Sequence, residues 1–267
     1  MGGRGMSALD PPDRLVPVYL INLDGSDERL RSATRQLDEA GIPFERVPAF
    51  DGRALRIEEF PDYDPAGAMA YMGRPLRGGE IGCYLSHLDC ARRFLDSGAE
   101  YGVVFEDDMQ LKPGFAKGLR ILSDWLDRHD RDWDLINIGA GQHKIFTPVM
   151  GFEVAGRHHD LTRAHYFPMT TTGLIWSRQG AETFVSTHRR ITAGVDNHFR
   201  HWLTRSDRGL AVWPPLVTTT GVESQIEDGK GKRSASGRHP LYGLIKQRRQ
   251  LINKLIAWRH KRRLARG

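Results

Sequence analysis

The sequence predicts an α/β domain built around a mostly parallel sheet and followed by a basic C-terminal helix. Three observations indicate this class. Apolar, strand-like runs alternate with stretches of helical periodicity, the alternation begins with a strand–helix–strand unit, and one buried strand ends in acidic residues. Open α/β sheets bind ligands beyond the carboxyl ends of their strands. We place the domain at residues 14–228, a linker at 229–239 and the tail helix at 240–267.

The first unit runs from an apolar strand at 16–23 through a turn and a helix to a second strand before residue 50. Asp27 and Glu28 suit the first helical turn, and Gly41 ends the helix. Residues 51–79 are rich in Gly, Pro and acids and predict a long irregular connection.

The same alternation continues downstream. Helical spacing predicts a helix through Cys83 and Cys90, followed by a strand at 101–105, a helix at 113–127 and a strand within 133–140. Seven residues of helix rise about 10.5 Å, too far for a disulfide, so we expect two free thiols in a reducing compartment. Residues 141–176 are harder to interpret, and further helices are expected after Ser177 and from Asp196.

Composition and charge narrow the class of protein. The 267 residues, 39% hydrophobic and 27% charged, are typical of a globular chain. From residue 229 onward there are 13 Lys or Arg and no acids. Residues 1–228 therefore hold 26 basic and 33 acidic residues, a net charge of −7, although the whole chain has a net charge of +6. An acidic main body argues against a nucleic-acid partner. The sequence shows no apolar run of about 18 residues and no signal-peptide core at its start, so we expect a cytoplasmic protein.

The stretch VVFEDDMQL places three consecutive acids, Glu106, Asp107 and Asp108, at the end of a buried strand. Adjacent carboxylates repel one another unless a cation or a donor-rich ligand compensates them. Hard oxygen ligands suit Mg²⁺ or Mn²⁺, which bind through carboxylates and substrate phosphates. Glu106 and Asp108 form an acid-x-acid pair of candidate metal ligands, and Asp107 can face another part of the ligand. The alternative is a solvated strand end.

Three blocks in this order resemble glycosyltransferase family 25, the lipopolysaccharide-type β-galactosyltransferase family that also contains collagen galactosyltransferases. The blocks are VYLINLDGSDERL, GEIGCYLSHLDCARRFLDSG and VVFEDDMQL, and the resemblance covers residues 16–228. It implies a GT-A type fold, a UDP-sugar donor with galactose as the default, Mn²⁺ or Mg²⁺ at Glu106 and Asp108, and inverting transfer to a hydroxyl of lipopolysaccharide or another glycoconjugate.

The resemblance also implies donor contacts. Asn22 and Leu23 would meet the base or ribose, Arg29 the phosphate, and Ser86, His87 and Asp107 other parts of the donor site. Arg29 also suits a surface ion pair, and the Ser86–His87 pair also suits a buried, hydrogen-bonded role.

Asp196 in AGVDNHFRHW is the candidate base that deprotonates the acceptor hydroxyl, because a helix start can both orient and expose a carboxylate. The alternative is simple N-capping. A further metal ligand is sought among Glu223, Ser224 and Asp228, none of which is assigned.

The tail at 240–267 predicts an amphipathic basic helix. Each Lys or Arg near an anionic leaflet contributes about 1 kcal/mol, and a Leu/Ile face can enter the interface. We therefore expect peripheral binding to the inner face of the cytoplasmic membrane; packing on its own domain or on another subunit is the alternative. The apolar residues are Leu241, Leu244, Ile245, Leu251, Ile252, Leu255 and Ile256.

Two other functions also use clustered acids. A metal-dependent phosphodiesterase or nuclease needs two metals and additional His or Asp ligands, for which only His158, His159 and Asp160 form a cluster. A non-catalytic relative would bind the donor without transferring its sugar.

Overall fold

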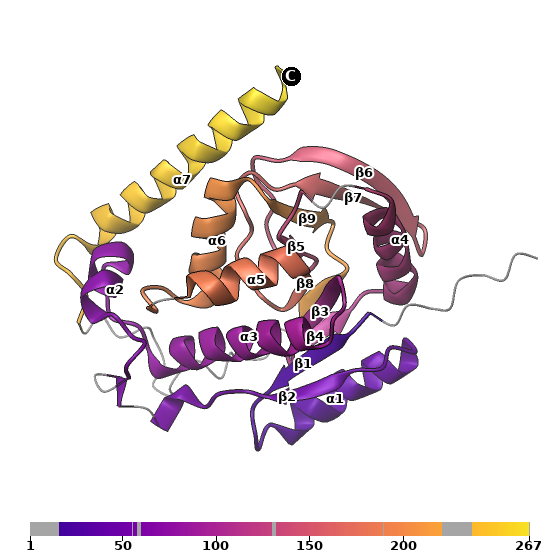
Figure 1. Cartoon of the computed structure of the whole chain (residues 1–267), viewed down its shortest axis with the longest axis horizontal. Helices are drawn as coiled ribbons and strands as arrows, with labels where there is room; N and C mark the ends of the chain where they lie inside the picture. Colours follow the sequence, from indigo (N-terminus) through magenta and orange to yellow (C-terminus); the bar gives the residue numbers. More distant parts are fainter. Residues whose placement is uncertain are drawn as a thin grey trace, which may run out of the picture.

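The structure, a computed structural model, describes residues 16–54, 56–57, 60–129, 132–188, 190–220 and 237–266 (Figure 1). The strands are β1 (Val18–Asn22), β2 (Glu45–Pro48), β3 (Tyr101–Glu106), β4 (Met109–Leu111), β5 (Leu135–Asn137), β6 (Thr147–Val154), β7 (Arg157–Arg163), β8 (Gly173–Ser177), β9 (Gly209–Trp213) and β10 (Val217–Thr219). The helices are α1 (Asp27–Glu39), η1 (Gly52–Ala54), α2 (Pro65–Met72), α3 (Gly78–Asp96), α4 (Phe115–Arg128), α5 (Arg178–Thr187), α6 (Val195–Ser206) and α7 (Tyr242–Leu264).

Eight strands form one sheet in the order β2-β1-β3-β8-β5-β9-β7-β6, and β10 pairs with β4 in a second, two-stranded sheet. β1 is parallel to β2 and β3, and β5 is parallel to β9. β8 runs antiparallel to β3 and β5, and β7 runs antiparallel to β9 and β6. All the strands of the large sheet except β7 and β8 therefore share one direction, which confirms the predicted α/β class and mostly parallel sheet.

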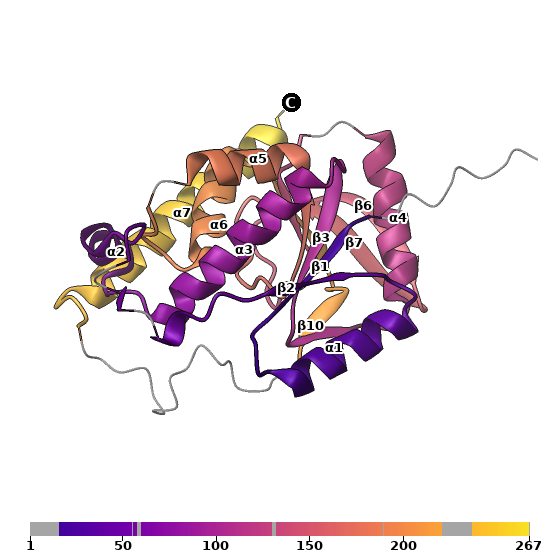
Figure 2. The same ribbon diagram turned by 60° about the horizontal axis from the view of Figure 1, so that its bottom comes forward.

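Helices cover both faces of the large sheet (Figure 2). α3, α5 and α6 pack on one face, where Tyr19 and Ile21 of β1 point, while α1 and α4 pack on the other, where Val18 and Leu20 point. Successive side chains of a strand point to opposite faces, so a strand covered on both sides must be apolar throughout. This explains the unbroken apolar runs of β1 and β3.

Two segments differ from the sequence-based expectation. Residues 51–79 contain α2, in which Asp64 accepts a hydrogen bond from the Gly67 N–H, Pro65 opens the first turn and Gly73 ends the helix in the left-handed conformation. The Gly, Pro and acidic residues there mark helix ends. Residues 141–176 contain the β6–β7 hairpin, whose two-residue turn places Ala155 and Gly156 at φ 48° and 73°.

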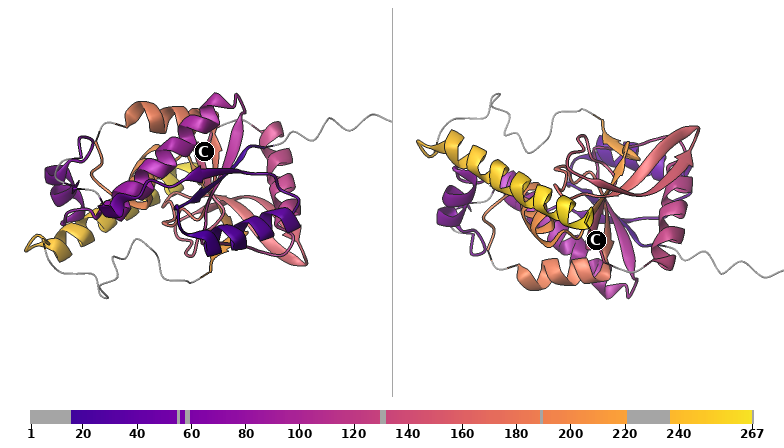
Figure 3. Two further views of the ribbon diagram at one scale, coloured as in Figure 1. Left: turned by 90° about the horizontal axis from the view of Figure 1, so that it is seen from below. Right: turned by 90° about the horizontal axis from the view of Figure 1, so that it is seen from above.

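α7 lies along α2 and α6, and the views from opposite sides place it across the molecule from α1 (Figure 3). Its Asn253 side chain accepts a hydrogen bond from Arg205 of α6 (2.9 Å), and its Arg249 donates one to the Tyr71 carbonyl of α2 (2.7 Å). Among the described residues, no helix is both long and apolar enough to cross a bilayer. Both cysteines are free thiols, as expected.

Candidate active site

The turn between β3 and β4 positions the acidic triplet. β4 pairs with β10, and the Thr220 N–H donates to the Asp108 carbonyl at 2.8 Å, so the backbone is held on both sides of the turn. Glu106 and Asp108 line a cavity of about 820 Å³. Asp107 lies between them in the sequence and bonds in a different direction, to Asn22.

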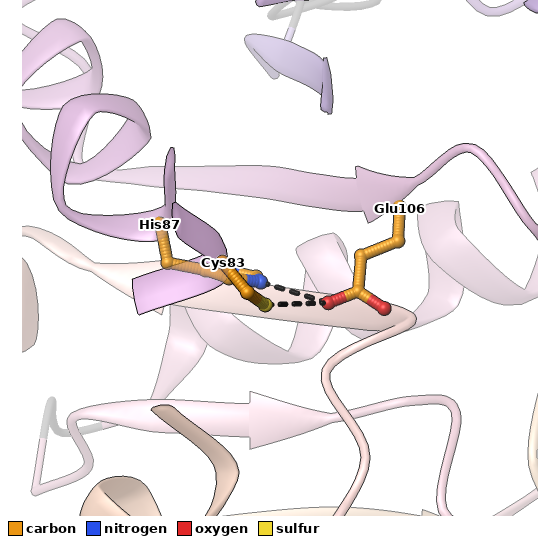
Figure 4. Close-up of side chains that lie close together, drawn as sticks. All are labelled: Cys83, His87 and Glu106. Atoms are coloured by element: carbon orange, nitrogen blue, oxygen red, sulfur yellow. Dashed lines mark hydrogen bonds and ion pairs between the residues drawn. The ribbon is translucent and has the colours of Figure 1, made fainter. Parts of the chain in front are cut away.

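Three side chains converge on one oxygen of Glu106, and Figure 4 shows two of them, Cys83 and His87. Its Oε1 lies 2.6 Å from the Thr171 hydroxyl, 3.1 Å from His87 Nε2 and 3.7 Å from Cys83 Sγ. Burial alone would raise the pKa of Glu106. The hydrogen bond and electrostatic attraction from His87, with the hydrogen bonds from Thr171 and Cys83, outweigh burial and lower this pKa. Glu106 is therefore a fixed carboxylate whose Oε2 accepts no hydrogen bond from the described residues.

Cys83 Sγ, His87 Nε2 and Glu106 Oε1 all lie within 4.8 Å of one another, a donor set that can hold a transition-metal ion. Burial, followed by the charge of Glu106, raises the pKa of the Cys83 thiol well above its usual range. In the metal-free protein the protonated thiol donates to the carboxylate, so these residues orient Glu106 by hydrogen bonding. A bound transition-metal ion would displace the thiol proton and make Cys83 a ligand.

Asp108 has the opposite environment. Its buried Oδ1 has no hydrogen-bond partner among the described residues. Burial, and then repulsion from Glu106 and Asp107, raises the pKa of Asp108 to about 6. An unpaired carboxylate oxygen beside a second carboxylate fits a hard divalent cation, so the donor chemistry of Asp108 and Glu106 suits Mg²⁺ or Mn²⁺.

Asn22, Arg29 and Asp107 form a second group at the end of β1. Asn22 Nδ2 donates to Asp107 at 2.8 Å, and Arg29 Nη1 lies 3.4 Å from the same carboxylate. Arg46 of β2 donates to Asn22 Oδ1 at 2.9 Å. The Leu23 side chain is half-buried beside this group. Burial raises the pKa of Asp107, against the hydrogen bond from Asn22 and the charge of Arg29.

Ser86 and His87 are both buried within α3. The Ser86 hydroxyl accepts a hydrogen bond from the Phe50 N–H (2.9 Å) and donates one to the Gly82 carbonyl (2.8 Å), which ties the segment after β2 to α3. The His87 side chain is 0% exposed and meets Glu106. In this structure Ser86 positions the backbone of Phe50, and His87 positions the carboxylate of Glu106.

Asp196 lines the same cavity as Glu106 and Asp108. Gly194, not Asp196, occupies the N-cap of α6. The Asn197 backbone N–H and side-chain amide donate to Asp196 Oδ1 at 2.6 and 3.0 Å, and no described residue donates to Oδ2. Burial raises the pKa of Asp196 despite these bonds. An oriented carboxylate with one unengaged oxygen can accept a proton.

The candidate cluster at residues 158–160 does not join this cavity. His158 is exposed and bonds to Glu153 and Asp160, while His159 is buried and bonds to the Pro214 carbonyl. None of the residues 158–160 lines the cavity that contains Glu106. The candidates Glu223, Ser224 and Asp228 lie outside the described residues.

Sequence reasoning missed Thr171, Cys83 and the wall that α7 contributes to the cavity. The run of three threonines before β8 was a usable signal for Thr171. Cys83 stands four residues before His87, the spacing that places two side chains on one helical face. The α7 wall has no local sequence signal, since it depends on how distant helices pack.

Comparisons with known proteins identify the family to which the sequence is similar. The family model described as "Glycosyltransferase family 25 (LPS biosynthesis protein)" matches residues 15–199. Procollagen galactosyltransferase 1 of Danio rerio is 33% identical over 174 residues, which cover 62% of this chain and 27% of that protein. Procollagen galactosyltransferase 2 of Homo sapiens is 33% identical over 188 residues, covering 66% and 29%. The chain thus matches less than a third of the length of these relatives.

Among solved structures, the crystal structure of "a glycosyltransferase involved in the glycosylation of the major capsid of PBCV-1" is similar with a TM-score of 0.38 and 8% identity. The similarity covers 78% of this chain and 94% of that one.

Proposed function

The chain belongs to glycosyltransferase family 25, and from this premise we propose that it transfers a sugar, galactose by default, from a UDP-sugar to a hydroxyl of lipopolysaccharide or another glycoconjugate, with inversion at the anomeric carbon. The convergence of Glu106, Asp108 and Asp196 on one cavity carries the proposal. The names of the relatives support galactose, and the family description supports a lipopolysaccharide acceptor.

The donor binds across the β3–β4 turn in this proposal. Its nucleotide lies over the end of β1, beside Asn22, Leu23 and Arg29, and its diphosphate reaches the acids. Asp108 and Glu106 would hold Mn²⁺ or Mg²⁺, and the bound ion supplies positive charge to the diphosphate as it leaves. Asp107 keeps Arg29 turned toward the same turn.

Asp196 acts on the acceptor. Its Oδ2 takes the proton of the acceptor hydroxyl while Asn197 holds Oδ1. Its raised pKa makes it a stronger base than an exposed aspartate. The acceptor oxygen forms its bond to the anomeric carbon from the face opposite the diphosphate, and the bond from that carbon to the diphosphate breaks with its electron pair leaving on UDP.

A transfer assay tests this function. Wild-type protein incubated with UDP-galactose, Mn²⁺ and a lipopolysaccharide core oligosaccharide should release UDP and form a galactoside. Asp196→Asn should lose at least about 100-fold in turnover, the contribution expected of a general base, while binding UDP normally. UDP binding without transfer would indicate a non-catalytic relative, and cleavage of nucleic acid would indicate a nuclease; either result contradicts the proposal.

We extend the proposal to a peripheral position on the inner face of the cytoplasmic membrane, where α7 meets the lipid. Ile245, Ile252 and Ile256 are half-buried, whereas the leucines on the other side of the apolar face are exposed. Leu244, Leu251 and Leu255 are 61%, 58% and 60% exposed. Exposed leucines among Lys and Arg residues suit the interface of an anionic bilayer.

Vesicles containing anionic lipid test this contact. Leu251→Gln combined with Leu255→Gln should leave the fold intact and reduce co-sedimentation with the vesicles. Unchanged binding would assign the contact to another surface.

A further inference from the structure

The cavity carries opposite charges on different walls. Glu106 and Asp108 line it at the end of β3, whereas α7 and the residues just before it contribute Arg238, Lys246 and Arg249. Another acid in the lining, Glu80, is already paired with Arg74 at 2.6 Å. The cations on the α7 side therefore face a cavity in which no described carboxylate lies within ion-pair distance of them.

Arg238 shows the clearest need for a partner. Its guanidinium lies 4.8 Å from the centroid of the Tyr242 ring, and its buried Nε has no hydrogen-bond partner among the described residues. A buried donor without a partner is unfavourable, and more so when it is charged. Asp108 lacks a partner of the opposite kind, since its buried Oδ1 is an acceptor that receives no hydrogen bond from the described residues. One cavity thus holds an unpaired carboxylate oxygen of Asp108 and an unpaired guanidinium N–H of Arg238. This pair suits ligands that place a cation against Asp108 and an anionic group against Arg238.

Lys246 and Arg249 extend this positive wall along one face of α7. Lys246 is exposed and forms no ion pair with the described residues. Arg249 is held in place by the Tyr71 carbonyl at 2.7 Å and by the Tyr71 ring, whose centroid lies 5.0 Å away. Neither of these contacts brings a negative charge, so the charge of Arg249 is not neutralised. An anion entering here would therefore meet positioned cations, the arrangement that favours charge-assisted hydrogen bonds.

The position of this wall favours the acceptor over the donor. Asn22, Leu23 and Arg29, where the nucleotide is expected, do not line this cavity. α1 and α7 lie on opposite sides of the molecule (Figures 1 and 3). Asp196, the candidate base, comes from α6, the helix against which α7 packs. The acceptor must approach Asp196, so its remaining groups extend toward α7.

We propose that Arg238 and Lys246, supported by Arg249, form an anion subsite for a phosphate or carboxylate group on the acceptor glycan. The inference rests on the proposed glycosyl transfer and specifies its acceptor class. A negatively charged acceptor sugar is selected by this wall, and a neutral one lacks that contact.

Calorimetry on protein saturated with UDP and Mn²⁺ tests the subsite, with glucose 6-phosphate, glucuronate, glucose and inorganic phosphate as probes. The two anionic sugars should bind at least about tenfold more tightly than glucose, and more tightly than inorganic phosphate. Lys246→Gln and Arg238→Gln should abolish this preference without changing UDP affinity. Arg248→Gln is the matched control, because Arg248 is an exposed cation of α7 outside the cavity lining.

Each contrary outcome has a distinct meaning. Equal binding of glucose and the anionic sugars, with normal UDP binding, overturns the subsite and leaves the transferase intact. Weaker UDP binding in the Lys246 and Arg238 variants would move these cations to the donor diphosphate and overturn the acceptor assignment. Inorganic phosphate binding as tightly as glucose 6-phosphate would overturn recognition of a glycan. Loss of the preference for anionic sugars in Arg248→Gln would attribute that preference to the overall positive charge of α7 and overturn the subsite. Absence of UDP binding in wild type overturns the donor site itself.

Discussion

Asp108→Asn is expected to stabilise the folded protein while it abolishes transfer. The fold raises the pKa of this carboxyl from 3.8 to about 6, so the charged form is less favourable in the folded chain than in the unfolded one. One pKa unit corresponds to about 1.4 kcal/mol, which sets an upper limit of about 3 kcal/mol on the penalty. Because Asp108 retains some contact with solvent, we expect about 1–2 kcal/mol.

The pH dependence follows from the same shift. Below about pH 3 the carboxyl is protonated in both states and contributes no penalty. As the pH rises toward about 6, the unfolded chain releases its proton first, and the stability of the wild type falls relative to that of the variant. The advantage of Asp108→Asn should therefore be complete above about pH 7 and absent below about pH 3.

Urea unfolding at both pH values, in metal-free buffer, measures this difference. Asp51→Asn is the control, because Asp51 is exposed and its pKa is lowered to about 2 by hydrogen bonds from Arg53, so that variant should gain no stability. Mn²⁺ should stabilise the wild type and not Asp108→Asn, since a ligand stabilises only the state that binds it. A less stable Asp108→Asn protein at neutral pH would refute the account of an unpaired, penalised carboxylate.

Three further outcomes are expected. The affinity of the wild type for Mn²⁺ should fall as the pH drops through about 6, because Asp108 must lose its proton to hold a cation; an affinity independent of pH between about 5 and 7 would contradict this. Thr171→Val should cost about 1.5–3 kcal/mol in urea unfolding, because a 2.6 Å bond to charged Glu106 is lost, and unchanged stability would exclude that bond. Asn22→Ala should cost about 2–3 kcal/mol, since it leaves the partly buried Asp107 without the Asn22 amide donor and Arg46 Nε without the Asn22 acceptor; chemical unfolding with an unchanged midpoint would show that this cluster is dispensable.

Much of the fold could be predicted because the relevant signals are local. The apolar runs of β1 and β3 follow from burial on both faces, and the acids after β3 identify the carboxyl end of a strand in a mostly parallel sheet. α2 was missed because caps at Asp64 and Gly73 have the same composition as a loop. The β6–β7 hairpin was missed because no Asn-Gly or Asp-Gly pair marks its turn.

The candidate site could be predicted only in part. The acidic triplet and Asp196 were recognisable as oriented carboxylates, but the sequence does not show that Glu106 is bonded by its neighbours while Asp108 is not. That difference depends on Thr171 and His87, which come from separate elements. The basic wall of the cavity depends on where α7 packs, which helical periodicity alone does not specify.

The most direct test of the central claim is UDP binding by calorimetry, with and without Mn²⁺, in the wild type and in Asp108→Asn. We predict that Mn²⁺ tightens UDP binding by at least about tenfold in the wild type and has no effect in a folded Asp108→Asn protein. UDP binding that is indifferent to both Mn²⁺ and Asp108, or no UDP binding by the wild type, would contradict the assignment of a metal-assisted nucleotide-sugar site to this turn.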